Sequence, residues 1–510
     1  MKKSAVFLKI LILLCIILLC ACSSNDKDNK NDKDSINPDN RTADIDAKKE
    51  EVPERPPTVP ESVNFKGETI KIFSYHAEDS VEVNLEQAVN LVEDVVYKKY
   101  MKVMGNINVN IEFGYPTPQD WSIDGYSNEV MRLMMADDFD YDMIFGVQYM
   151  CQFLTGKEYL ANIHNLPYVD VTQPWWAKKY IDEITVGNDT LFFVTGDIGL
   201  GFVQSLSTMF YNKNMYTSLF GGESDDLYNT VLNGDWTHDM MYELSKSAYR
   251  NLDGTGKVNR ETDQFGAVVQ RIALSDHYFY TMGPRVTIRD ENGIPKINLG
   301  DEHSISVLEK VRKMFDDNIG ALDLTGSQAE DWIVEFTSGR VLFYPSSSIS
   351  AAEGMTNMAN DYGIIPMPKY DKNQVDYLAQ AHDSVPVFCV PSNATNYDMI
   401  GAVLEEMAYW AYTDVTPTYF NEALRFRYSR DESDVASSMV DLIRDGATTD
   451  FGYVYGLRIV GKLNDFNNNG LGYVQRYLTR NPRTGIASYI EKGMAVWETK
   501  LAELVDLYLE

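Results

Sequence analysis

Several short segments combine tyrosine with amide, hydroxyl or imidazole side chains, and each follows a run of apolar residues. Tyrosine rings can stack on the apolar face of a small ligand, and polar side chains can pair its hydroxyl groups once water is excluded. Ligands of open parallel sheets bind beyond the carboxyl ends of the strands, so segments in these positions are candidates for a binding site. The candidates are Tyr75, His76, Gln148, Tyr149, Tyr280, Tyr344, Ser346 and Ser347. Because the chain has 32 tyrosines, core packing stays the alternative for each of them, and the serines can equally form a polar loop.

Motifs for covalent or metal-assisted catalysis are absent from the sequence. The histidines form no His-Glu-x-x-His pair, no Gly-x-Ser-x-Gly elbow occurs, and no phosphate-cradling glycine-rich loop ends in Lys-Ser or Lys-Thr. We therefore expect a binding protein rather than an enzyme. A glycosidase needs only two carboxylates across a cleft, and with 75 acidic residues the sequence leaves that alternative open.

One segment has the spacing of a calcium loop. Asn251, Asp253, Thr255 and Asn259 stand at positions one, three, five and nine of an EF-hand-like run. An EF-hand needs a bidentate Glu at position twelve, and Thr262 stands there. We expect no cofactor, with a structural calcium near Asn251–Asp263 left open. A second run, Asp465–Gly470, has Arg476 at the twelfth position and is rejected as a calcium loop.

The elements that must position the candidate residues alternate between strands and helices. The period of the apolar residues predicts a first series of strands and helices, followed by a second α/β series and a largely helical end. The first series has strands at Glu68–Phe73, Asn108–Phe113 and Tyr141–Phe145, with helices at Leu85–Val103 and Asn128–Met135. The second has strands at Thr208–Tyr211, Phe265–Val269, Arg340–Tyr344, Tyr362–Ile365 and Ser384–Val390, with helices at Asp235–Arg250 and Ile305–Asn318. Helices at Met399–Tyr412, Asp434–Asp445 and Ser488–Leu509 complete the chain. This order predicts an α/β fold with doubly wound parallel strands.

The first residues predict export. Lys2 and Lys3 precede the apolar run Ile10–Ala21, which is too short to span a bilayer and suits a signal peptide. The run ends in Leu19-Cys20-Ala21-Cys22, which resembles a bacterial lipobox with Cys22 as the acylated first residue of the mature protein. Cleavage as an ordinary secretory signal is the alternative. Residues 1–21 are thus the expected signal peptide, and the polar residues 22–63 an expected disordered linker.

The composition of the chain excludes some classes of binding partner. The formal net charge of −30 argues against nucleic acid, which demands clustered basic residues. It also disfavours anionic lipid, so we expect the lipid anchor alone to hold the protein to the extracellular side of the cell membrane. Beyond the lipobox the chain has two cysteines, Cys151 and Cys389, each within an apolar run. Two separately buried thiols are expected, with a disulfide as the alternative.

Eight stretches together resemble the extracellular solute-binding proteins of family 1, the sugar-type receptors of ATP-binding cassette (ABC) importers. Each is weak alone, but their order and spacing from about residue 65 to the end carry the resemblance. They are Tyr141–Gly146, Tyr159–Ile163, Leu191–Asp197, Met209–Lys213, Trp236–Asp239, Asp263–Gly266, Phe336–Gly339 and Tyr362–Pro368.

The resemblance implies a periplasmic-binding-protein-like fold of two lobes joined by a hinge that the chain crosses three times. The N-terminal lobe would hold residues 64–196 and 379–412, and the C-terminal lobe residues 199–378 and 415–510. The crossings would lie at Gly196–Gly199, Ala379–Asp383 and Asp414–Pro417, which adds Asp197 and Asp383 to the candidate ligand residues. Trp175 and Trp176 could form a stacking platform, with a buried helix start as the alternative.

The resemblance also implies a function. A monomer would capture a saccharide, which we expect to be an oligosaccharide, between its lobes and deliver it to an ABC permease, with no metal and no catalytic residue. Two alternatives stay open: a secreted carbohydrate-active enzyme on a similar frame, and a receptor for a non-sugar solute such as a peptide.

Overall fold

A computed structural model describes residues 55–509 except 77–79, 87–89, 117–124, 188, 328, 422–423, 425–430, 432 and 461–469. The expected signal peptide, Cys22 and most of the expected linker lie outside the described residues. Two five-stranded sheets form the framework of the described chain.

The first sheet has the strand order β2-β1-β3-β13-β4. Its strands are β1 (Glu68–Ser74), β2 (Val109–Gly114), β3 (Met143–Val147), β4 (Phe193–Val194) and β13 (Pro386–Cys389). The strands β1, β2 and β3 are parallel, as the alternation of strands and helices predicts, whereas β13 runs antiparallel to both β3 and β4. The strand β13 therefore returns to the first sheet from a distant part of the sequence.

The second sheet has the strand order β11-β5-β10-β6-β9. Its strands are β5 (Thr208–Asn212), β6 (Phe265–Val269), β9 (Ala321–Asp323), β10 (Val341–Ser346) and β11 (Tyr362–Ile365). The strands β6, β9 and β10 are parallel, and β5 runs antiparallel to its neighbours β10 and β11. All residues of β5, β6, β10 and β11 are buried, as expected for strands covered on both faces.

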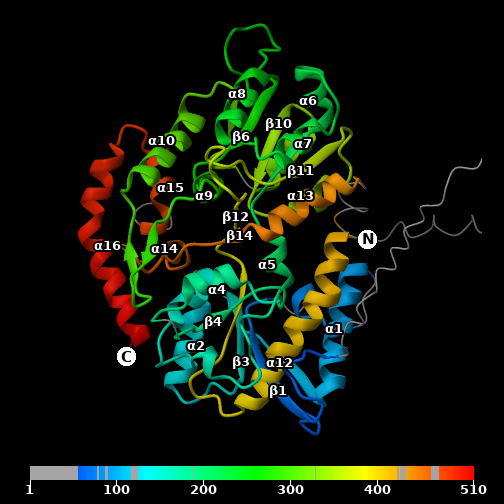
Figure 1. Cartoon of the computed structure of the whole chain (residues 1–510), viewed down its shortest axis with the longest axis vertical. Helices are drawn as coiled ribbons and strands as arrows, with labels where there is room; N and C mark the ends of the chain where they lie inside the picture. Colours follow the sequence, from blue (N-terminus) through cyan, green and yellow to red (C-terminus); the bar gives the residue numbers. More distant parts are fainter. Residues whose placement is uncertain are drawn as a thin grey trace, which may run out of the picture. The chain divides into compact units, whose positions relative to one another are not determined.

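The helices cover the two sheets, and α1 and α12 run side by side (Figure 1). The first part of the chain has α1 (Leu91–Ile107), α2 (Gly125–Met135), α3 (Gln148–Cys151), α4 (Lys178–Ile184), α5 (Leu200–Gln204), α6 (Lys213–Phe220), α7 (Asp226–Leu232) and α8 (His238–Ala248). The later part has α9 (Ala273–Tyr280), α10 (Glu302–Asp316), α11 (Ala329–Thr337), α12 (Tyr397–Trp410), α13 (Asp434–Asp445), α14 (Phe451–Val454), α15 (Val474–Arg480) and α16 (Ile486–Leu509). Two-stranded sheets join β7 (Thr287–Arg289) to β8 (Pro295–Ile297), and β12 (Ala379–Gln380) to β14 (Ala447–Thr448).

Side-chain caps set several helix starts. Helix α1 begins at Leu91 instead of the predicted Leu85, because the Asn90 side chain accepts a hydrogen bond from the backbone N–H of Glu93. Helix α8 begins at His238 instead of the predicted Asp235, and the Thr237 side chain accepts from the backbone N–H of Met240. Helix α13 has the predicted bounds. No helix was predicted from the sequence at α9, which carries the candidate residue Tyr280.

Three chain segments lie together between the strands of the first and second sheets. Strand β12 pairs in parallel with β14, and Leu206 forms an antiparallel bridge with Ala381. The expected crossing at Ala379–Asp383 contains β12, whereas residues 196–199 and 414–417 lie outside this small assembly. Residues Ala411–Val415 form a π-helical turn at the end of α12. The hinge and the lobe boundaries stay predictions.

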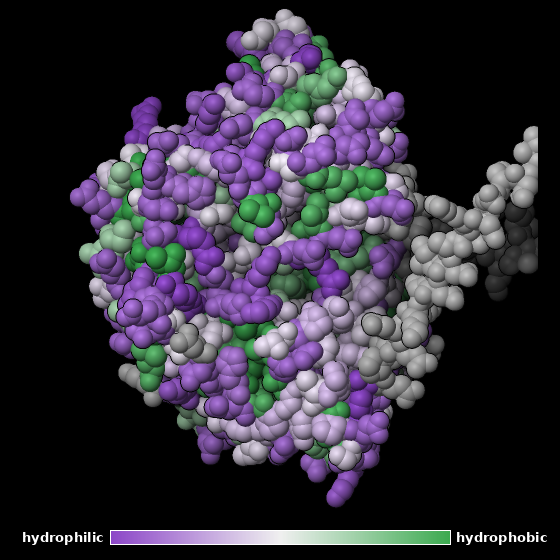
Figure 2. Space-filling view, viewed as in Figure 1, coloured by the Kyte–Doolittle hydropathy of each residue, from purple (hydrophilic) through white to green (hydrophobic). Residues whose placement is uncertain are grey.

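The interior contains Trp236 and both cysteines of the described chain. Trp236 is fully buried and donates through its indole N–H to the Pro366 carbonyl oxygen. Cys151 and Cys389 are buried free thiols. They are not buried separately as expected, because a hydrogen bond joins their side chains. The face of the molecule drawn in Figure 2 is mostly hydrophilic, with scattered apolar residues.

Candidate ligand-binding site

The carboxyl ends of β1 and β3 bring two predicted tyrosines together. The backbone N–H of Tyr75 donates to the Phe145 carbonyl oxygen at 2.8 Å, which holds the residue after β1 against β3. The Tyr75 and Tyr149 hydroxyl oxygens are 3.1 Å apart. His76 packs its ring 4.6 Å from that of Phe145, and its pKa lies below the ordinary value because burial disfavours the charged form. These strand ends thus hold three of the predicted residues in one place.

Asp383 joins this group through the backbone. The N–H of Tyr149 donates to the Asp383 carbonyl oxygen, and the N–H of Gln148 donates to the Val385 carbonyl oxygen, both at 3.0 Å. The side chain of Gln148 is fully buried and accepts a hydrogen bond from the Tyr180 hydroxyl at 2.5 Å. The segment that leads into β13 therefore lies against the start of α3.

The Asp383 carboxylate connects these residues to α9 and α15. Its Oδ2 lies 3.3 Å from both Arg476 Nη2 and the Tyr473 hydroxyl, and its Oδ1 lies 3.2 Å from His382 Nδ1. Arg476 Nε donates to Asp276 Oδ1 at 2.8 Å, and Nη2 donates to Asp276 Oδ2. We call the following residues the central cluster: Tyr75, Tyr149, Asp276, His277, His382, Asp383, Tyr473, Gln475 and Arg476.

Burial and charge act in opposite directions on the pKa values of Asp383 and Arg476, and in the same direction on that of His277. Burial raises the pKa of Asp383, but nearby His382 and Arg476 outweigh this effect and leave it below the ordinary value. Burial lowers the pKa of Arg476, and the Asp276 carboxylate more than compensates, so its pKa lies well above the ordinary value. Burial lowers the pKa of His277 well below the ordinary value. Arg476 and Asp383 are therefore ionised at neutral pH, and His277 is uncharged.

Several buried polar atoms of this region have no hydrogen-bond partner among the described residues. They are Nδ1 and Nε2 of His277, Oε1 of Gln475, Nε2 of Gln148 and Nε2 of His76. Each such buried group costs about 1–3 kcal/mol if it stays unpaired. His76 and Gln148 follow the ends of β1 and β3, whereas His277 and Gln475 lie on α9 and α15. Unpaired buried groups are what a site that pairs ligand hydroxyls would present.

Two of the remaining predicted residues pack instead. Tyr344 is 3% exposed and stacks on Phe210 with ring centroids 5.8 Å apart, so the packing alternative describes its position. Tyr280 is buried and donates its hydroxyl hydrogen to the Gly472 carbonyl oxygen at 2.7 Å, which places it at the edge of the central cluster.

The predicted serines follow the end of β10. Ser346 is buried and pairs in register with Thr208. Ser347 is half-buried. The loop folds on itself, because the Ser348 N–H donates to Ser346 Oγ at 3.2 Å. No hydrogen bond between described residues joins these serines to the central cluster.

Asp197 lines a separate cavity of about 340 Å³. Its carboxylate accepts from Arg444 Nη2 at 3.1 Å, and burial raises its pKa to about 6. Trp175 and Trp176 also line this cavity but are only 4% and 3% exposed, which agrees with a buried helix start. We call it the Asp197 cavity.

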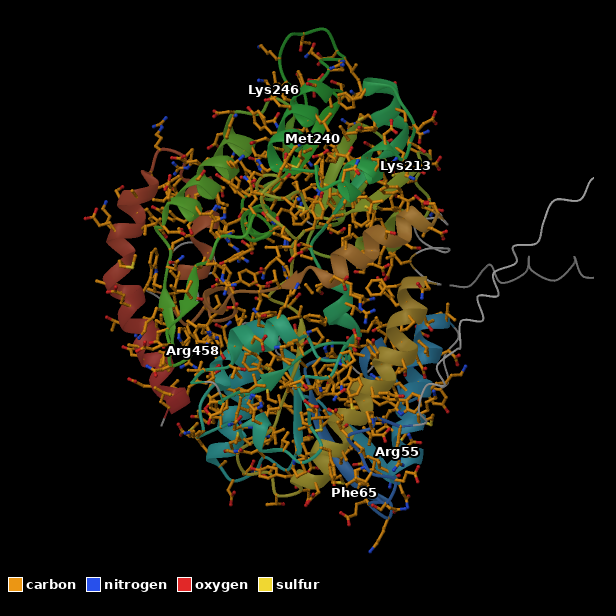
Figure 3. All side chains as sticks on the ribbon, viewed as in Figure 1. Arg55, Phe65, Lys213, Met240, Lys246 and Arg458 are labelled. Atoms are coloured by element: carbon orange, nitrogen blue, oxygen red, sulfur yellow. The ribbon has the colours of Figure 1, made fainter. Side chains whose placement is uncertain are left out.

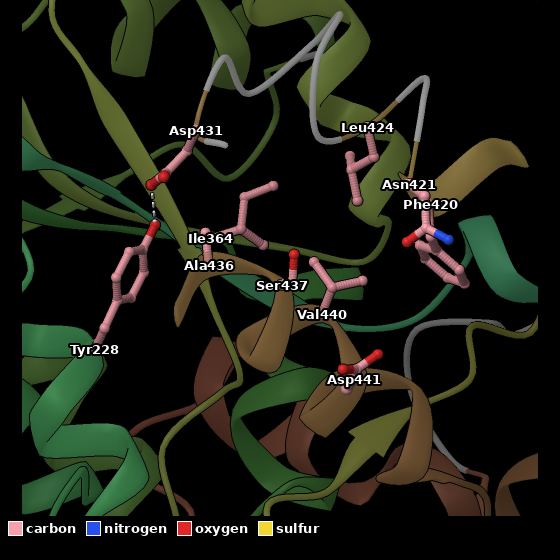
Figure 4. Close-up of a pocket in the computed structure, with 10 residues that line it drawn as sticks. All are labelled: Tyr228, Ile364, Phe420, Asn421, Leu424, Asp431, Ala436, Ser437, Val440 and Asp441. Atoms are coloured by element: carbon pink, nitrogen blue, oxygen red, sulfur yellow. Dashed lines mark hydrogen bonds between the residues drawn. The ribbon is translucent and has the colours of Figure 1, made fainter. Parts of the chain in front are cut away.

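Two further cavities lie outside the central cluster. One of about 360 Å³ lies between α1 and the π-helical turn and is lined by Lys102 and Asp414, whose charged atoms are 2.6 Å apart. The other, beside β11 and α13, is about 70 Å³ (Figure 4), which is room for a few waters rather than a ligand. Tyr228 donates its hydroxyl hydrogen to Asp431 at its wall.

Five members of the central cluster, on α9, on α15 and on the turn before α15, were not predicted from the sequence: Asp276, His277, Tyr473, Gln475 and Arg476. The sequence pattern gave Arg476 no role beyond the twelfth position of the rejected calcium loop, where it replaces the required Glu. The available signal was an arginine within the apolar and aromatic run Leu471–Leu478, because a buried arginine requires a carboxylate partner.

The possible calcium loop is held by its own side chains. Asp253 accepts from the N–H and the hydroxyl of Thr255, and Asp263 accepts from the N–H groups of Leu252 and Asn259. These bonds lower the pKa of Asp253 to about 2. The described residues contain no group of three or more His, Cys, Asp or Glu side chains placed to hold a metal ion. Calcium binding stays untested.

The C-terminal part of the chain also contacts the segment after β3. Arg458, labelled in Figure 3, donates to the Gln152 carbonyl oxygen at 3.0 Å, and the Leu457 N–H donates to Gln152 Oε1 at 3.2 Å. Residues of the first sheet region and of the C-terminal third thus build this part of the molecule together.

Comparison with solved structures finds the same architecture in proteins of very different sequence. The chain aligns over 86% of its length with 98% of a cyclo/maltodextrin-binding protein complexed with maltotetraose, at 12% identity and a TM-score of 0.54. It aligns over 86% of its length with all of an ABC transporter solute-binding protein from Thermotoga lettingae TMO bound with alpha-D-tagatose, at 13% identity and a TM-score of 0.52. The chain has the two-lobed fold of solute-binding proteins.

A third neighbour is the galacto-N-biose/lacto-N-biose I-binding protein of the ABC transporter from Bifidobacterium longum, in complex with lacto-N-biose. The alignment covers 87% of this chain and 98% of that one, at 10% identity and a TM-score of 0.53. No family model and no curated protein matches the sequence. Among the described residues, no helix is both long and apolar enough to cross a membrane.

Proposed function

We propose that this protein is an extracytoplasmic solute-binding receptor that captures a carbohydrate between two lobes and delivers it to an ABC importer. The observation that carries the proposal is the convergence of hydroxyl-pairing groups in the central cluster, from the segments that follow β1 and β3 and from α9 and α15. The structural neighbours bound to maltotetraose, alpha-D-tagatose and lacto-N-biose support a saccharide as the ligand.

The mechanism we propose is a population shift between open and closed forms. A solute that contacts residues of both lobes binds the closed form better and so favours it. Tyr75 and Tyr149 from the first sheet would contact one side of the solute, and His277 and Tyr473 the other. The permease would then recognise the closed form.

A thermal-shift panel of neutral oligosaccharides tests the receptor. A ligand at about one hundred times its Kd stabilises the folded state by about 2.7 kcal/mol, so a cognate sugar raises the Tm clearly. The sugar should be recovered intact by chromatography. Turnover of the sugar would instead support a carbohydrate-active enzyme, and a response to peptides alone would support a non-sugar receptor.

The matched variants are Tyr149→Ala and Tyr344→Phe. Tyr149→Ala removes a ring and a hydroxyl from the central cluster and should weaken sugar binding by at least tenfold. Tyr344→Phe keeps the packing of a core ring and should leave the Kd unchanged. Equal losses in the two variants would place the ligand elsewhere.

The lipid anchor belongs to the same proposal and rests on the lipobox at Leu19–Cys22. Cys22 would carry the lipid, and the protein would act as a monomer on the outer side of the cell membrane. Cells fed a labelled fatty acid should label the wild-type protein and not Cys22→Ser. The variant should remain unlabelled and leave the membrane fraction; persistence of the label would refute acylation at Cys22.

A further inference from the structure

The charged groups of the central cluster are engaged with one another. Arg476, whose side chain is 4% exposed, is shared by the carboxylates of Asp276 and Asp383. Asp276 also accepts from Gln475 Nε2 at 2.7 Å and from the Tyr453 hydroxyl at 3.3 Å. The Tyr473 ring lies 3.9 Å from the guanidinium carbon of Arg476 and covers its face. These charges form a frame that holds α9, α15 and the Asp383 segment together.

The polar atoms left over are uncharged. Both ring nitrogens of His277 and Oε1 of Gln475 lack a partner among the described residues, and both side chains are completely buried. His277 faces the segment before β13, because its ring lies 6.0 Å from that of His382. Gln475 is adjacent in sequence to Arg476 and on the same helix. The groups available to a ligand therefore donate and accept hydrogen bonds without carrying charge.

A negatively charged sugar should bind to the central cluster more weakly than a neutral sugar. Its carboxylate would be buried near the carboxylates of Asp276 and Asp383, and the positive charge on Arg476 is already shared between those two. A buried charge without a partner costs far more than an unpaired hydroxyl. A neutral sugar of the same size would lose only hydroxyl–water bonds, which His277 and Gln475 can replace.

We propose that the central cluster selects an uncharged saccharide and rejects its uronate counterpart, with His277 and Gln475 pairing ligand hydroxyls. This inference rests on the proposed carbohydrate-receptor function and adds the charge class of its substrate. The internal ion pairs orient the neutral groups and at the same time exclude a ligand carboxylate.

The test compares each neutral oligosaccharide with the same sugar oxidised at C6 to the uronate, with isothermal titration calorimetry on the full chain. The neutral member should bind at least one hundred times more tightly. Equal or tighter binding of the uronate overturns the charge inference and leaves the receptor function intact. Binding of no saccharide at all overturns both.

Two variants separate recognition from folding. His277→Leu should weaken neutral-sugar binding at least tenfold, whereas His238→Leu should not. His238 is the matched control because it is also buried with both ring nitrogens unpaired among the described residues, but it lies on α8 outside the cluster. Equal effects of the two changes would overturn the assignment of His277.

Asp383→Asn tests the charge frame. It removes one of the two carboxylates that share Arg476, so the ratio of uronate to neutral Kd should fall at least tenfold. A general loss of packing would weaken both ligands and leave the ratio unchanged. An unchanged ratio in a folded variant overturns the role of the frame.

Discussion

The central cluster and the Asp197 cavity are built from similar parts in different surroundings. Each pairs an aspartate from the connections between the sheets with an arginine from the C-terminal third, Asp383 with Arg476 and Asp197 with Arg444. The Arg476 side chain is 4% exposed and serves two carboxylates, whereas that of Arg444 is 34% exposed and serves one. The same residue types therefore form an internal frame in one place and a cavity wall in the other.

The difference is visible in the pKa of the two aspartates. The pKa of Asp197 is raised to about 6, because the effect of burial outweighs that of the partly solvated Arg444. Asp383 lies below its ordinary value although burial acts to raise it, because His382 and Arg476 stand close by. The number and burial of the partners, rather than the presence of an ion pair, decide whether an aspartate here stays charged.

Replacing each arginine should show the largest difference in stability between the two regions. Arg476→Met leaves buried Asp276 without its cation and Asp383 with only His382 beside it, and should lower the free energy of unfolding by about 3–5 kcal/mol. Arg444→Met should cost no more than about 1 kcal/mol, since its partner can take up a proton and its own charge is partly solvated. Denaturant unfolding at neutral pH measures both. Equal losses would show that the two ion pairs are alike.

The fold followed from the sequence because its signals are local. Period-two apolar runs predicted β1 and β2, a short buried run predicted β3, and helix α13 has the predicted bounds. Helix starts were less certain, because a cap such as Asn90 is recognised only when the first turn forms around it. The antiparallel return of β13 depends on a connection between distant segments that no local pattern encodes.

The site was predictable only where it follows strand ends. Tyr75, Tyr149 and Asp383 come together because the ends of β1 and β3 and the segment before β13 meet at one edge. Arg476 and Asp276 lie 200 residues apart in sequence, and no local pattern at either position predicts that they form an ion pair. Tyr344 shows the opposite error, since the end of a strand can point a tyrosine into the core.

The pH dependence of stability should also differ between the Asp197 cavity and the central cluster. The pKa of Asp197 is raised to about 6 and that of Glu405, which accepts from the Trp176 indole at the cavity wall, to about 7. The folded state then binds a proton that the unfolded state releases at lower pH, so stability falls as pH rises from about 4 to 7.

Asp197→Asn and Glu405→Gln should each flatten this decline, by an amount on the order of 2 kcal/mol across that range. Asp383 has the opposite sign, because its lowered pKa contributes stability that is lost on acidification. Unfolding midpoints between pH 4 and 8 measure the effect. A decline that persists unchanged in the double variant would contradict the raised pKa values.

Ligand affinity distinguishes the two regions directly. Tyr412, which lines the Asp197 cavity, can be changed to Ala beside Tyr149→Ala in the central cluster. We expect the Kd of a cognate sugar to change less than threefold for Tyr412→Ala, since Tyr412 lies outside the central cluster, where Tyr75, Tyr149 and Asp383 converge. Titration calorimetry measures both variants, and a larger loss at Tyr412 would move the sugar site to the Asp197 cavity.

The smallest effect is expected at the rim of the Asp197 cavity. Lys179 is exposed, and its Nζ donates to the Asp445 carbonyl oxygen at 2.7 Å, which connects α4 to the end of α13. Contacts of this kind contribute little, because both partners are solvated when they separate. Lys179→Met should therefore change the free energy of unfolding by less than about 0.5 kcal/mol and leave sugar affinity unchanged. A larger change in the free energy of unfolding would mean that the rim contact stabilises the packing of these helices as the buried ion pairs of the central cluster do. The two regions would then differ in ligand binding alone.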